Sequence, residues 1–211
     1  MNIDVVADLH GFRPPLPGGD LLVIAGDLTA RDEEWQYEEF FSWCTELKYK
    51  QIILIGGNHD NRLPSAVSRY MKLPHMTYLC DVGTDFEGLK IWGTPWTKTF
   101  RGMNPHCKAF TFDTERELGE RWALIPEGID LLVTHSPPYG IRDVVVDGHQ
   151  MKSVGSPTLL QRILVVKPKV VVFGHIHEGY GREEVGGILY INASHVNEQY
   201  KPVNLPVRIV V

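Results

Sequence analysis

The sequence predicts an α/β fold in which buried, largely parallel β-strands alternate with helices. Short apolar runs rich in β-branched residues, such as 20–25 and 170–173, are typical of strands that are covered on both faces. Stretches between them, such as 31–49, carry apolar side chains at helical spacing. A chain of 211 residues is long enough for one domain with a sizeable core. No repeat or linker divides it, so we expect a single domain over residues 1–211.

The first part of the chain is predicted to form two strands, a helix and a third strand. Residues 2–7 and 20–25 are the strands, separated by a stretch rich in proline and glycine that is typical of a loop. The helix covers 31–49, and its acidic residues fall near its start, where the helix dipole favours them. The apolar run 51–55 is the third strand.

Shorter elements follow. Residues 64–71 are predicted as a helix because a proline stands at its start, and 76–79 as a short strand. Residues 85–92 surround Glu87-Gly88, a pair typical of a hairpin turn. The stretch 93–105 has no clear period, and such a stretch in a compact domain is often a binding loop.

The second half is predicted to repeat the alternation of helix and strand. A helix over 113–124 has Asp113 or Thr114 as a candidate cap, and Ser156-Pro157 is typical of a helix start. The remaining predictions, in chain order, are a strand at 130–133, an irregular stretch at 139–154, a helix to about residue 166, a strand at 169–173, a hairpin over 179–191 and a strand at 207–211.

Charge and composition argue against several classes of function. The net charge of -5 is mild, so we expect no extended nucleic-acid-binding face. No apolar run approaches the length of a membrane span, and the start of the chain does not resemble a signal peptide. The three cysteines are scattered, which suggests reduced thiols. We therefore expect a cytoplasmic protein without a membrane partner; the sequence does not indicate an oligomeric state.

Polar side chains follow five predicted strands at the point where each strand ends. In chain order they are Asp8 and His10, Asp27, Asn58 with His59 and Asp60, His135, and His175 with His177. Ligands gather outside the carboxyl ends of strands in open α/β sheets, so we expect these groups to converge. Mixed oxygen and imidazole donors suit Mn, Fe or Zn better than Ca or Mg. The set has more ligands than one four-coordinate ion needs, so it predicts two ions that share a bridging carboxylate. Paired ions of this kind are a known device for in-line displacement at phosphorus.

The most specific short motif is Gly57-Asn58-His59-Asp60. Asn58 offers a neutral carbonyl oxygen, His59 offers a proton or a positive charge, and Asp60 could orient that ring. Arg62 follows the motif and either reaches a phosphate or pairs with an acid. The other candidate substrate contacts are Trp96 and Arg101 in the irregular stretch 93–105 and Arg142 in 139–154; the alternative is that these stretches are packed surface loops.

The combined pattern resembles the calcineurin-like metallophosphoesterase superfamily and covers nearly the whole chain in the family's order. The matching motifs are Asp8-x-His10, Gly26-Asp27, Gly57-Asn58-His59-Asp60, His135 and Gly174-His175-x-His177. The segment 174–181 and Asn192-Ala193-Ser194 further resemble the class III cyclic-nucleotide phosphodiesterase-like branch and the related brain metallophosphoesterase-domain proteins.

This resemblance implies a four-layer α/β/β/α sandwich with two mixed β-sheets flanked by helices. By position in the motifs, one metal ion would be held by Asp8, His10 and His177, the other by Asn58, His135 and His175, and Asp27 would bridge them. His59 would face the phosphate, with Asp60 behind it. Gly26-Asp27 is followed by Leu28-Thr29-Ala30, so the extended acid-and-arginine motif of protein Ser/Thr phosphatases is absent. A phosphoprotein is therefore a poor substrate candidate.

The implied activity is hydrolysis of a phosphodiester by a hydroxide that bridges two divalent transition-metal ions. Mn²⁺ is favoured, and Fe, Zn, Ni and Co accept the same ligands. The expected substrate is a small phosphorylated molecule or nucleotide, cyclic nucleotides included. The alternatives are a phosphomonoesterase or nuclease on the same site, or a non-catalytic scaffold, although a scaffold would be expected to have lost some of these residues.

Overall fold

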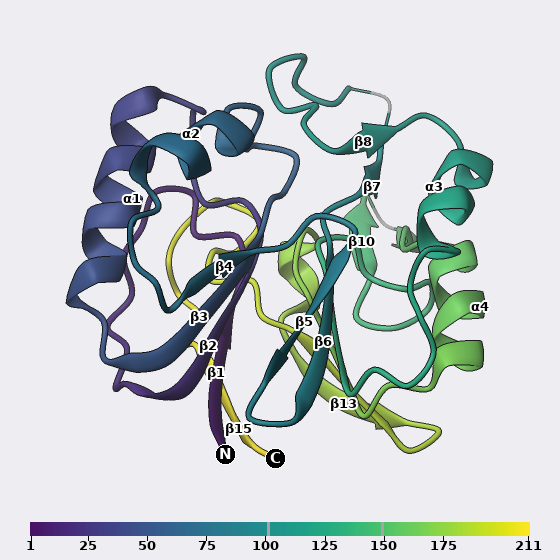
Figure 1. Cartoon of the computed structure of the whole chain (residues 1–211). Helices are drawn as coiled ribbons and strands as arrows, with labels where there is room; N and C mark the ends of the chain where they lie inside the picture. The colour runs from purple at the N-terminus through teal and green to yellow at the C-terminus, as the bar shows by residue number, and fades with distance from the viewer. Residues whose placement is uncertain (101, 149) are drawn as a thin grey trace.

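Two β-sheets pack face to face between two pairs of helices (Figure 1). The computed structural model describes residues 1–100, 102–148 and 150–211. The first sheet has the strand order β15-β1-β2-β3-β4 and the second has the order β13-β14-β12-β9-β6-β5. Each sheet mixes parallel and antiparallel pairs. The four-layer sandwich implied by the sequence resemblance is confirmed.

The elements have the following bounds. The first sheet comprises β1 (Asn2–Val6), β2 (Gly19–Ala25), β3 (Tyr49–Ile55), β4 (Met76–Tyr78) and β15 (Val207–Val210). The second comprises β5 (Val82–Phe86), β6 (Leu89–Thr94), β9 (Leu131–Thr134), β12 (Val170–Phe173), β13 (Gly181–Val185) and β14 (Ile188–Asn192). The helices are α1 (Glu34–Glu46), α2 (Leu63–Tyr70), α3 (Glu115–Trp122) and α4 (Pro157–Val166), with a 3₁₀ turn η1 (His177–Gly179). Two small ribbons pair β7 (Thr97–Lys98) with β8 (Thr111–Phe112) and β10 (Val144–Asp147) with β11 (Gln150–Ser153).

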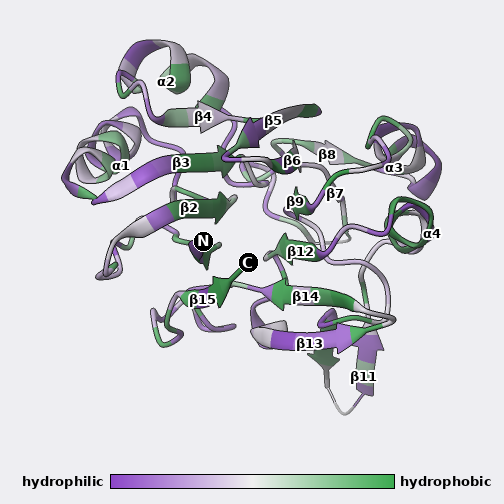
Figure 2. Ribbon diagram, turned by 60° about the horizontal axis from the view of Figure 1, so that its bottom comes forward, coloured by the Kyte–Doolittle hydropathy of each residue, from purple (hydrophilic) through white to green (hydrophobic). Residues whose placement is uncertain are grey.

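The alternation of side chains along each strand explains the layers. In β2, Leu21, Val23 and Ala25 face the second sheet, whereas Leu22 and Ile24 face the layer of α1 and α2. Because both faces are buried, the strand is apolar throughout, as parallel strands covered by helices usually are. A third apolar cluster lies between the second sheet and the helices α3 and α4. Figure 2 shows the hydrophobic residues concentrated on the strands and on the helix faces turned toward them.

Two clear differences from the sequence predictions are the end of the first long helix and the stretch 139–154. Helix α1 ends at Glu46, and the chain is already extended at Tyr49, where β3 begins. The stretch 139–154 was predicted to be irregular but contains the hairpin of β10 and β11. The β-branched run Val144-Val145-Val146 accounts for this hairpin, because such residues favour extended backbone.

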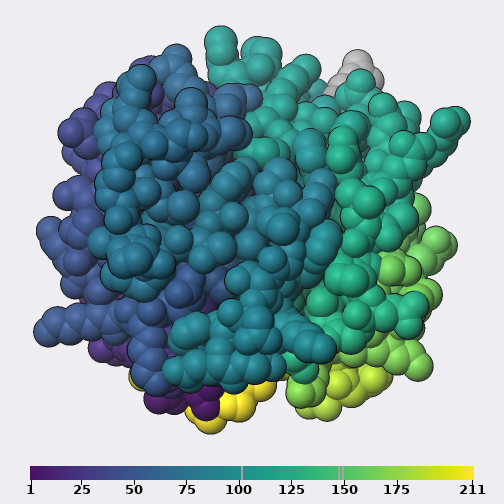
Figure 3. Space-filling model, in the orientation of Figure 1, coloured from purple at the N-terminus to yellow at the C-terminus, as the bar shows by residue number. Residues whose placement is uncertain are grey.

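The parallel strands place their carboxyl ends at one edge of the sandwich. Asn2 pairs with Val210, so both ends of the chain lie together at the opposite edge (Figure 1). In the view of Figure 3, the first half of the chain lies on the left and the second half on the right, and the two meet in a continuous surface. Among the described residues, no helix is both long and apolar enough to cross a membrane.

Candidate metal centre

The residues predicted as metal ligands meet at the carboxyl edge of the two sheets. Asp8, His10, Asp27 and Asn58 follow strands of the first sheet, and His135, His175 and His177 follow strands of the second. The separations are 3.4 Å for His10 Nε2 to His177 Nε2, 3.6 Å for His10 Nε2 to Asp27 Oδ2, 3.9 Å for His177 Nε2 to Asp8 Oδ1, 3.5 Å for His135 Nε2 to Asp27 Oδ1 and 3.1 Å for His135 Nε2 to Asn58 Oδ1. Side chains from five distant segments therefore surround one small volume.

Left-handed backbone at the strand ends produces this convergence. The φ angles are 52° at Asp8, 42° at His10, 53° at Asp27 and 68° at His175. Residues other than glycine rarely adopt this region, although Asp, Asn and His do so more often than most. Each such residue turns the chain sharply as it leaves its strand, and strain of this kind is concentrated at functional sites. The sequence patterns did not predict this feature.

The Asp8 side of the centre is held by groups from the second sheet. The backbone N–H of His175 donates to both Asp8 carboxylate oxygens, at 3.1 and 2.9 Å, and the Ser194 hydroxyl donates to Oδ2 at 2.5 Å. His177 Nδ1 lies 3.1 Å from the carbonyl oxygen of Asn197. That nitrogen therefore carries the ring proton, and the Nε2 lone pair is turned toward Asp8 and His10.

The Asp27 side is organised in the same way. The backbone N–H of His59 donates to Asp27 Oδ1 at 2.9 Å. His135 Nδ1 lies 3.0 Å from the carbonyl oxygen of Ala25, so its Nε2 faces the oxygens of Asp27 and Asn58. Asn58 Nδ2 donates to the Cys107 carbonyl at 3.4 Å, which turns the amide oxygen of Asn58 inward. The oxygens of Asp27 and Asn58 and the Nε2 atom of His135 thus point at one place, and all three atoms can serve as ligands of a cation.

Burial and charge set the protonation of the centre. Burial lowers the pKa of His10 and of His175 to about 3, so both imidazoles are neutral and have a lone pair to donate. Burial opposes ionisation of Asp27, but the neighbouring His135 and His59 rings outweigh it and hold the pKa of Asp27 well below its usual value. Burial lowers the pKa of His135, but the Asp27 carboxylate raises it to a final value of about 9. Burial raises the pKa of Asp8.

These donors fit divalent transition-metal ions. Three groups of side chains each offer ligand atoms within 4.8 Å of one another: Asp8, His10 and His177; His10, Asp27 and His59; and Asp8, Asp27 and His135. Asp8, His10 and Asp27 each belong to two of the groups, so the groups share ligands and form one centre. His175 belongs to none of them, but its ring lies 5.0 Å from that of His135. A mixture of neutral imidazoles and carboxylates suits ions such as Mn, Fe and Zn.

Asp60 does not orient the His59 ring as predicted. Its buried carboxylate accepts hydrogen bonds from the backbone N–H groups of Leu28 (3.1 Å), Thr29 (3.2 Å) and Gly57 (2.9 Å). Asp60 therefore joins the loop after β2 to the loop after β3 and acts on their backbone. His59 Nδ1 instead lies 3.4 Å from both the Ala30 carbonyl and Cys107 Sγ. Its Nε2 is 4.0 Å from Asp27 Oδ2.

Two predicted substrate contacts have structural partners instead. Trp96 Nε1 donates to Asp81 Oδ2 at 2.7 Å, and the Arg121 guanidinium lies 4.8 Å from its ring centroid. The guanidinium of Arg142 donates to the carbonyl of Arg182 at 2.8 Å and so fixes strand β13. The sequence could not distinguish these roles, because both partners are distant in the chain. Arg101 lies outside the described residues.

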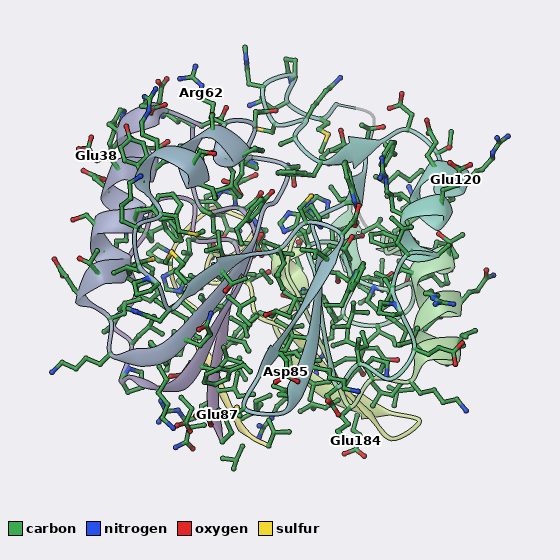
Figure 4. All side chains as sticks on the ribbon, in the orientation of Figure 1. Glu38, Arg62, Asp85, Glu87, Glu120 and Glu184 are labelled. Carbon is green, nitrogen blue, oxygen red and sulfur yellow. The ribbon has the colours of Figure 1, made fainter. Side chains whose placement is uncertain are left out.

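Arg62 lies at the outer rim. Its side chain points outward above α2 in Figure 4, and its Nε is 3.8 Å from Asp32 Oδ2. It also lines a polar cavity of about 580 Å³ that reaches His59. Pairing with an acid, one of the two predicted roles, is therefore observed. A contact of Arg62 with substrate stays a prediction.

A larger cavity of about 840 Å³ opens directly on the centre. Asp27, Asn58, His59, His175 and His177 form its polar wall. Other lining residues come from the β7 strand and the β10–β11 hairpin, and from loops that contribute Phe100, Tyr139, Val154 and Tyr200. The stretches 93–105 and 139–154, predicted as irregular, thus shape the space beside the centre.

Comparison with known proteins agrees with this geometry. The family model described as calcineurin-like phosphoesterase matches residues 1–179. The chain belongs to the calcineurin-like phosphoesterase family. It is 35% identical to metallophosphoesterase domain-containing protein 1 of Homo sapiens over 97% of this chain and 69% of that protein, and 33% identical to a UPF0046 protein of Caenorhabditis elegans over 91% of this chain and 54% of that one. It resembles the structure of TT1561 of Thermus thermophilus with a TM-score of 0.60 at 15% identity, over 90% of this chain and 88% of that one.

Membership of the family identifies the protein as a metal-dependent phosphoesterase. The resemblance read from the sequence motifs is therefore confirmed. The family match ends at residue 179, before three contributors to the centre: Ser194, Asn197 and Tyr200. Ser194 stands in a motif that the sequence comparison noted, but its contact with Asp8 was not predicted. Asn197 and Tyr200 carry no sequence pattern that could have marked them.

Changing Gly174 to alanine tests how closely the phosphoesterase centre is packed. A Cβ atom there would lie 2.3 Å from Asp8 Oδ2 and 2.5 Å from Ala7 Cβ, so Asp8 must move. We expect Gly174→Ala to weaken metal binding by about tenfold or more, the effect of disturbing groups that position a ligand. Metal titration by calorimetry measures the effect. Gly119→Ala in helix α3 is the matched control, because its Cβ meets Thr158 only at 3.6 Å. Equal affinities in the two variants would contradict the prediction.

Proposed function

We propose that this phosphoesterase hydrolyses phosphodiesters, with two divalent transition-metal ions, and that its substrates are small nucleotide-like molecules. The observation that carries the proposal is that His59 lines two cavities at once, one of about 840 Å³ and one of about 580 Å³. Asn104 and Cys107 also line both. A phosphoryl group held at His59 would have room for an organic substituent on each side. A diester has two such substituents, whereas a monoester has one.

The two cavities differ in chemistry. The larger one contains Phe100, Tyr139, Val145 and Val146, which offer apolar and aromatic surface to a ring system. The smaller one is lined mainly by polar and charged residues. Asymmetry of this kind favours a substrate with one flat, apolar substituent and one hydrophilic substituent, as a nucleotide has. Cavities of about 840 and 580 Å³ are the size of a small-molecule site, and the net charge of -5 disfavours binding of long nucleic acid.

The proposed ligands are those that the family resemblance implies, and the convergence of the side chains supports them. Asp8, His10 and His177 would hold one ion, Asn58, His135 and His175 the other, and Asp27 would belong to both. When bound, two divalent ions stabilise negative charge on phosphoryl oxygens and promote ionisation of water. The mixture of imidazole and carboxylate donors accommodates Mn²⁺, which we favour, as well as Fe, Zn, Ni or Co.

His59 is proposed to act on the leaving group. Its Nδ1 lies 3.4 Å from the Ala30 carbonyl oxygen, so a proton on Nδ1 is donated to that carbonyl. Its Nε2 lies 4.0 Å from Asp27 Oδ2, and the residue lines both cavities. A proton donated from Nε2 to the departing oxygen would contribute about 10²–10⁴-fold to the rate, as general acids usually do.

A reconstitution experiment tests the proposed function. The protein is stripped of metal with a chelator, and hydrolysis of bis(p-nitrophenyl) phosphate and of p-nitrophenyl phosphate is measured with Mn²⁺ restored. We expect no activity without metal, activity after Mn²⁺ addition, and a higher kcat/KM for the diester. His59→Ala should lower kcat by about 10²-fold or more while the bound metal is retained.

The control for the variant is His75→Ala, a histidine before β4 that does not belong to the centre. A higher kcat/KM for the monoester would replace the proposal by a phosphomonoesterase. Absence of activity with every divalent ion and either ester would contradict it.

A further inference from the structure

A tyrosine from the last part of the chain stands over the histidines of the centre. The Tyr200 ring centroid lies 4.9 Å from that of His10, 5.1 Å from that of His177 and 6.4 Å from that of His59. The first two contacts are edge-on, with ring planes at 75° and 89°. Tyr200 also lines the larger cavity. No other aromatic residue among the described ring contacts touches three histidines of the centre.

The backbone that carries Tyr200 is closely fixed. The Tyr200 N–H donates to the Asn197 carbonyl at 2.8 Å, and Asn197 N–H donates to the Lys201 carbonyl at 2.9 Å. The Asn197 side-chain oxygen accepts from the backbone N–H groups of Gln199, at 3.1 Å, and Lys201, at 2.9 Å. These bonds close a tight turn, so the position of the tyrosine is set before any ligand binds.

Tyr200 also adopts an unfavourable conformation. Its φ is 58°, and a bulky residue in the left-handed region is an outlier. Strain of this kind persists where surrounding contacts hold it, and it marks functional positions. Here the contacts lead to the centre, because the Asn197 carbonyl that closes the turn also lies 3.1 Å from His177 Nδ1.

The side chain of Tyr200 is not an ordinary core residue. It is 52% exposed, so burial of its ring supplies only part of the stabilisation that a packed tyrosine would give. In the part of the chain that the structure describes, its hydroxyl has no hydrogen-bond partner. Tyr78, Tyr139 and Tyr190 share this lack of a partner, whereas the hydroxyls of Tyr37, Tyr49, Tyr70 and Tyr180 each donate to a named oxygen. Of the unpartnered tyrosines, Tyr200 is the one whose ring contacts three histidines of the centre.

We infer that Tyr200 contacts the substrate, with its hydroxyl donating a hydrogen bond to a phosphoryl oxygen of the ester bound at the centre. The inference rests on the proposed function and adds a neutral donor to it. Where the cavity meets the centre it is lined by three imidazoles, the Asn58 amide and the Asp27 carboxylate, and a carboxylate repels a phosphate unless cations lie between them. A phenol hydroxyl donates without adding negative charge. The matched family region ends at residue 179, so this group is supplied by the segment that follows it.

Inorganic phosphate is the probe for the test, because it has the phosphoryl oxygens without an organic group. Its affinity for the Mn²⁺-loaded protein is measured by calorimetry, alongside kcat/KM for the diester and the metal content. We expect Tyr200→Phe to weaken phosphate binding and kcat/KM each by about tenfold to a hundredfold, the range for a hydrogen bond to a charged group, with metal content unchanged. Tyr200→Ala should weaken phosphate binding and kcat/KM by no more than a few-fold beyond the effect of Tyr200→Phe.

Tyr180→Phe is the matched control. It removes a tyrosine hydroxyl that donates to the Leu205 carbonyl at 2.8 Å in the same part of the fold, away from the cavity. It should leave phosphate affinity and kcat/KM within about twofold, as for a surface change away from the site.

Each outcome decides the inference. Phosphate affinity in Tyr200→Phe equal to that of the unmodified protein overturns it, as does loss of metal in that variant. Failure of the unmodified protein to bind phosphate also overturns it. If the protein binds phosphate in a Tyr200-dependent way but hydrolyses no ester, the inference stands and the proposed function fails.

Discussion

Asp27→Asn is expected to lower kcat/KM for a phosphodiester by more than about a hundredfold. Removal of a group that only supports a metal ligand costs up to about a hundredfold, so loss of a ligand itself should cost more. Asp27 faces His10 at 3.6 Å and His135 at 3.5 Å, so its carboxylate is the group shared by both halves of the centre. An amide has one oxygen in place of two and lacks the charge. The number of tightly bound metal ions, measured by mass spectrometry of the desalted protein, should fall by at least one.

The matched control for this change is Asp85→Asn. Asp85 lies in strand β5 at the edge of the second sheet (labelled in Figure 4), is exposed, and accepts one backbone hydrogen bond, from Gly88 at 3.0 Å. That variant should keep activity and metal content. Full activity in Asp27→Asn, or an unchanged number of bound ions, would show that Asp27 does not bridge the two ions.

Asp60→Ala is expected to destabilise the fold by about 3 kcal/mol or more, because each buried donor left unpaired costs about 1–3 kcal/mol. The carboxylate is buried and accepts from three backbone N–H groups of two different loops. Urea unfolding measures the free energy of unfolding. Activity should fall as well, since the loop after β2 carries Asp27 and the loop after β3 carries Asn58 and His59.

Asp85→Ala provides the comparison. It should lower the free energy of unfolding by less than about 1 kcal/mol, as substitutions at exposed positions usually do. The experiment also distinguishes the two roles considered for Asp60. If the carboxylate served only to orient the His59 ring, kcat would fall and the free energy of unfolding would not. A stability equal to that of the unmodified protein would therefore contradict the role that the structure gives this residue.

The strand ends made most of the centre predictable from the sequence. Asp8, Asp27 and Asn58 follow neighbouring parallel strands of the first sheet, whose ends must lie close together, and His135 follows a strand of the second sheet that packs against it. Spacing alone therefore located the polar groups that meet. The left-handed backbone at Asp8 and Asp27 was not predictable, because residues other than glycine rarely adopt it and no sequence pattern marks it.

Residues outside the strand ends were harder to predict. Trp96 was predicted to contact substrate because it stands in an irregular stretch, yet its indole is bonded to Asp81, whose position no local pattern reveals. Asp60 was taken for a partner of the adjacent His59, whereas two of its backbone partners, Leu28 and Thr29, lie about thirty positions earlier. Tyr200 went unnoticed because it stands in a loop without period. Local patterns specify elements, and contacts between distant loops require the fold.

The main-chain contacts at the end of β1 have a consequence for how the protein tolerates mutation. Ala7 N–H donates to the Ala193 carbonyl and the Ala7 carbonyl accepts from His195 N–H, each at 2.8 Å, so the two sheets are joined beside the centre. Asp8, the next residue, is in turn held by His175 of the other sheet. The contacts that keep the sheets together thus also fix the distances between ligands from opposite halves. Substitutions that weaken these contacts are therefore expected to lower stability and activity together, so the two properties cannot evolve independently at this position.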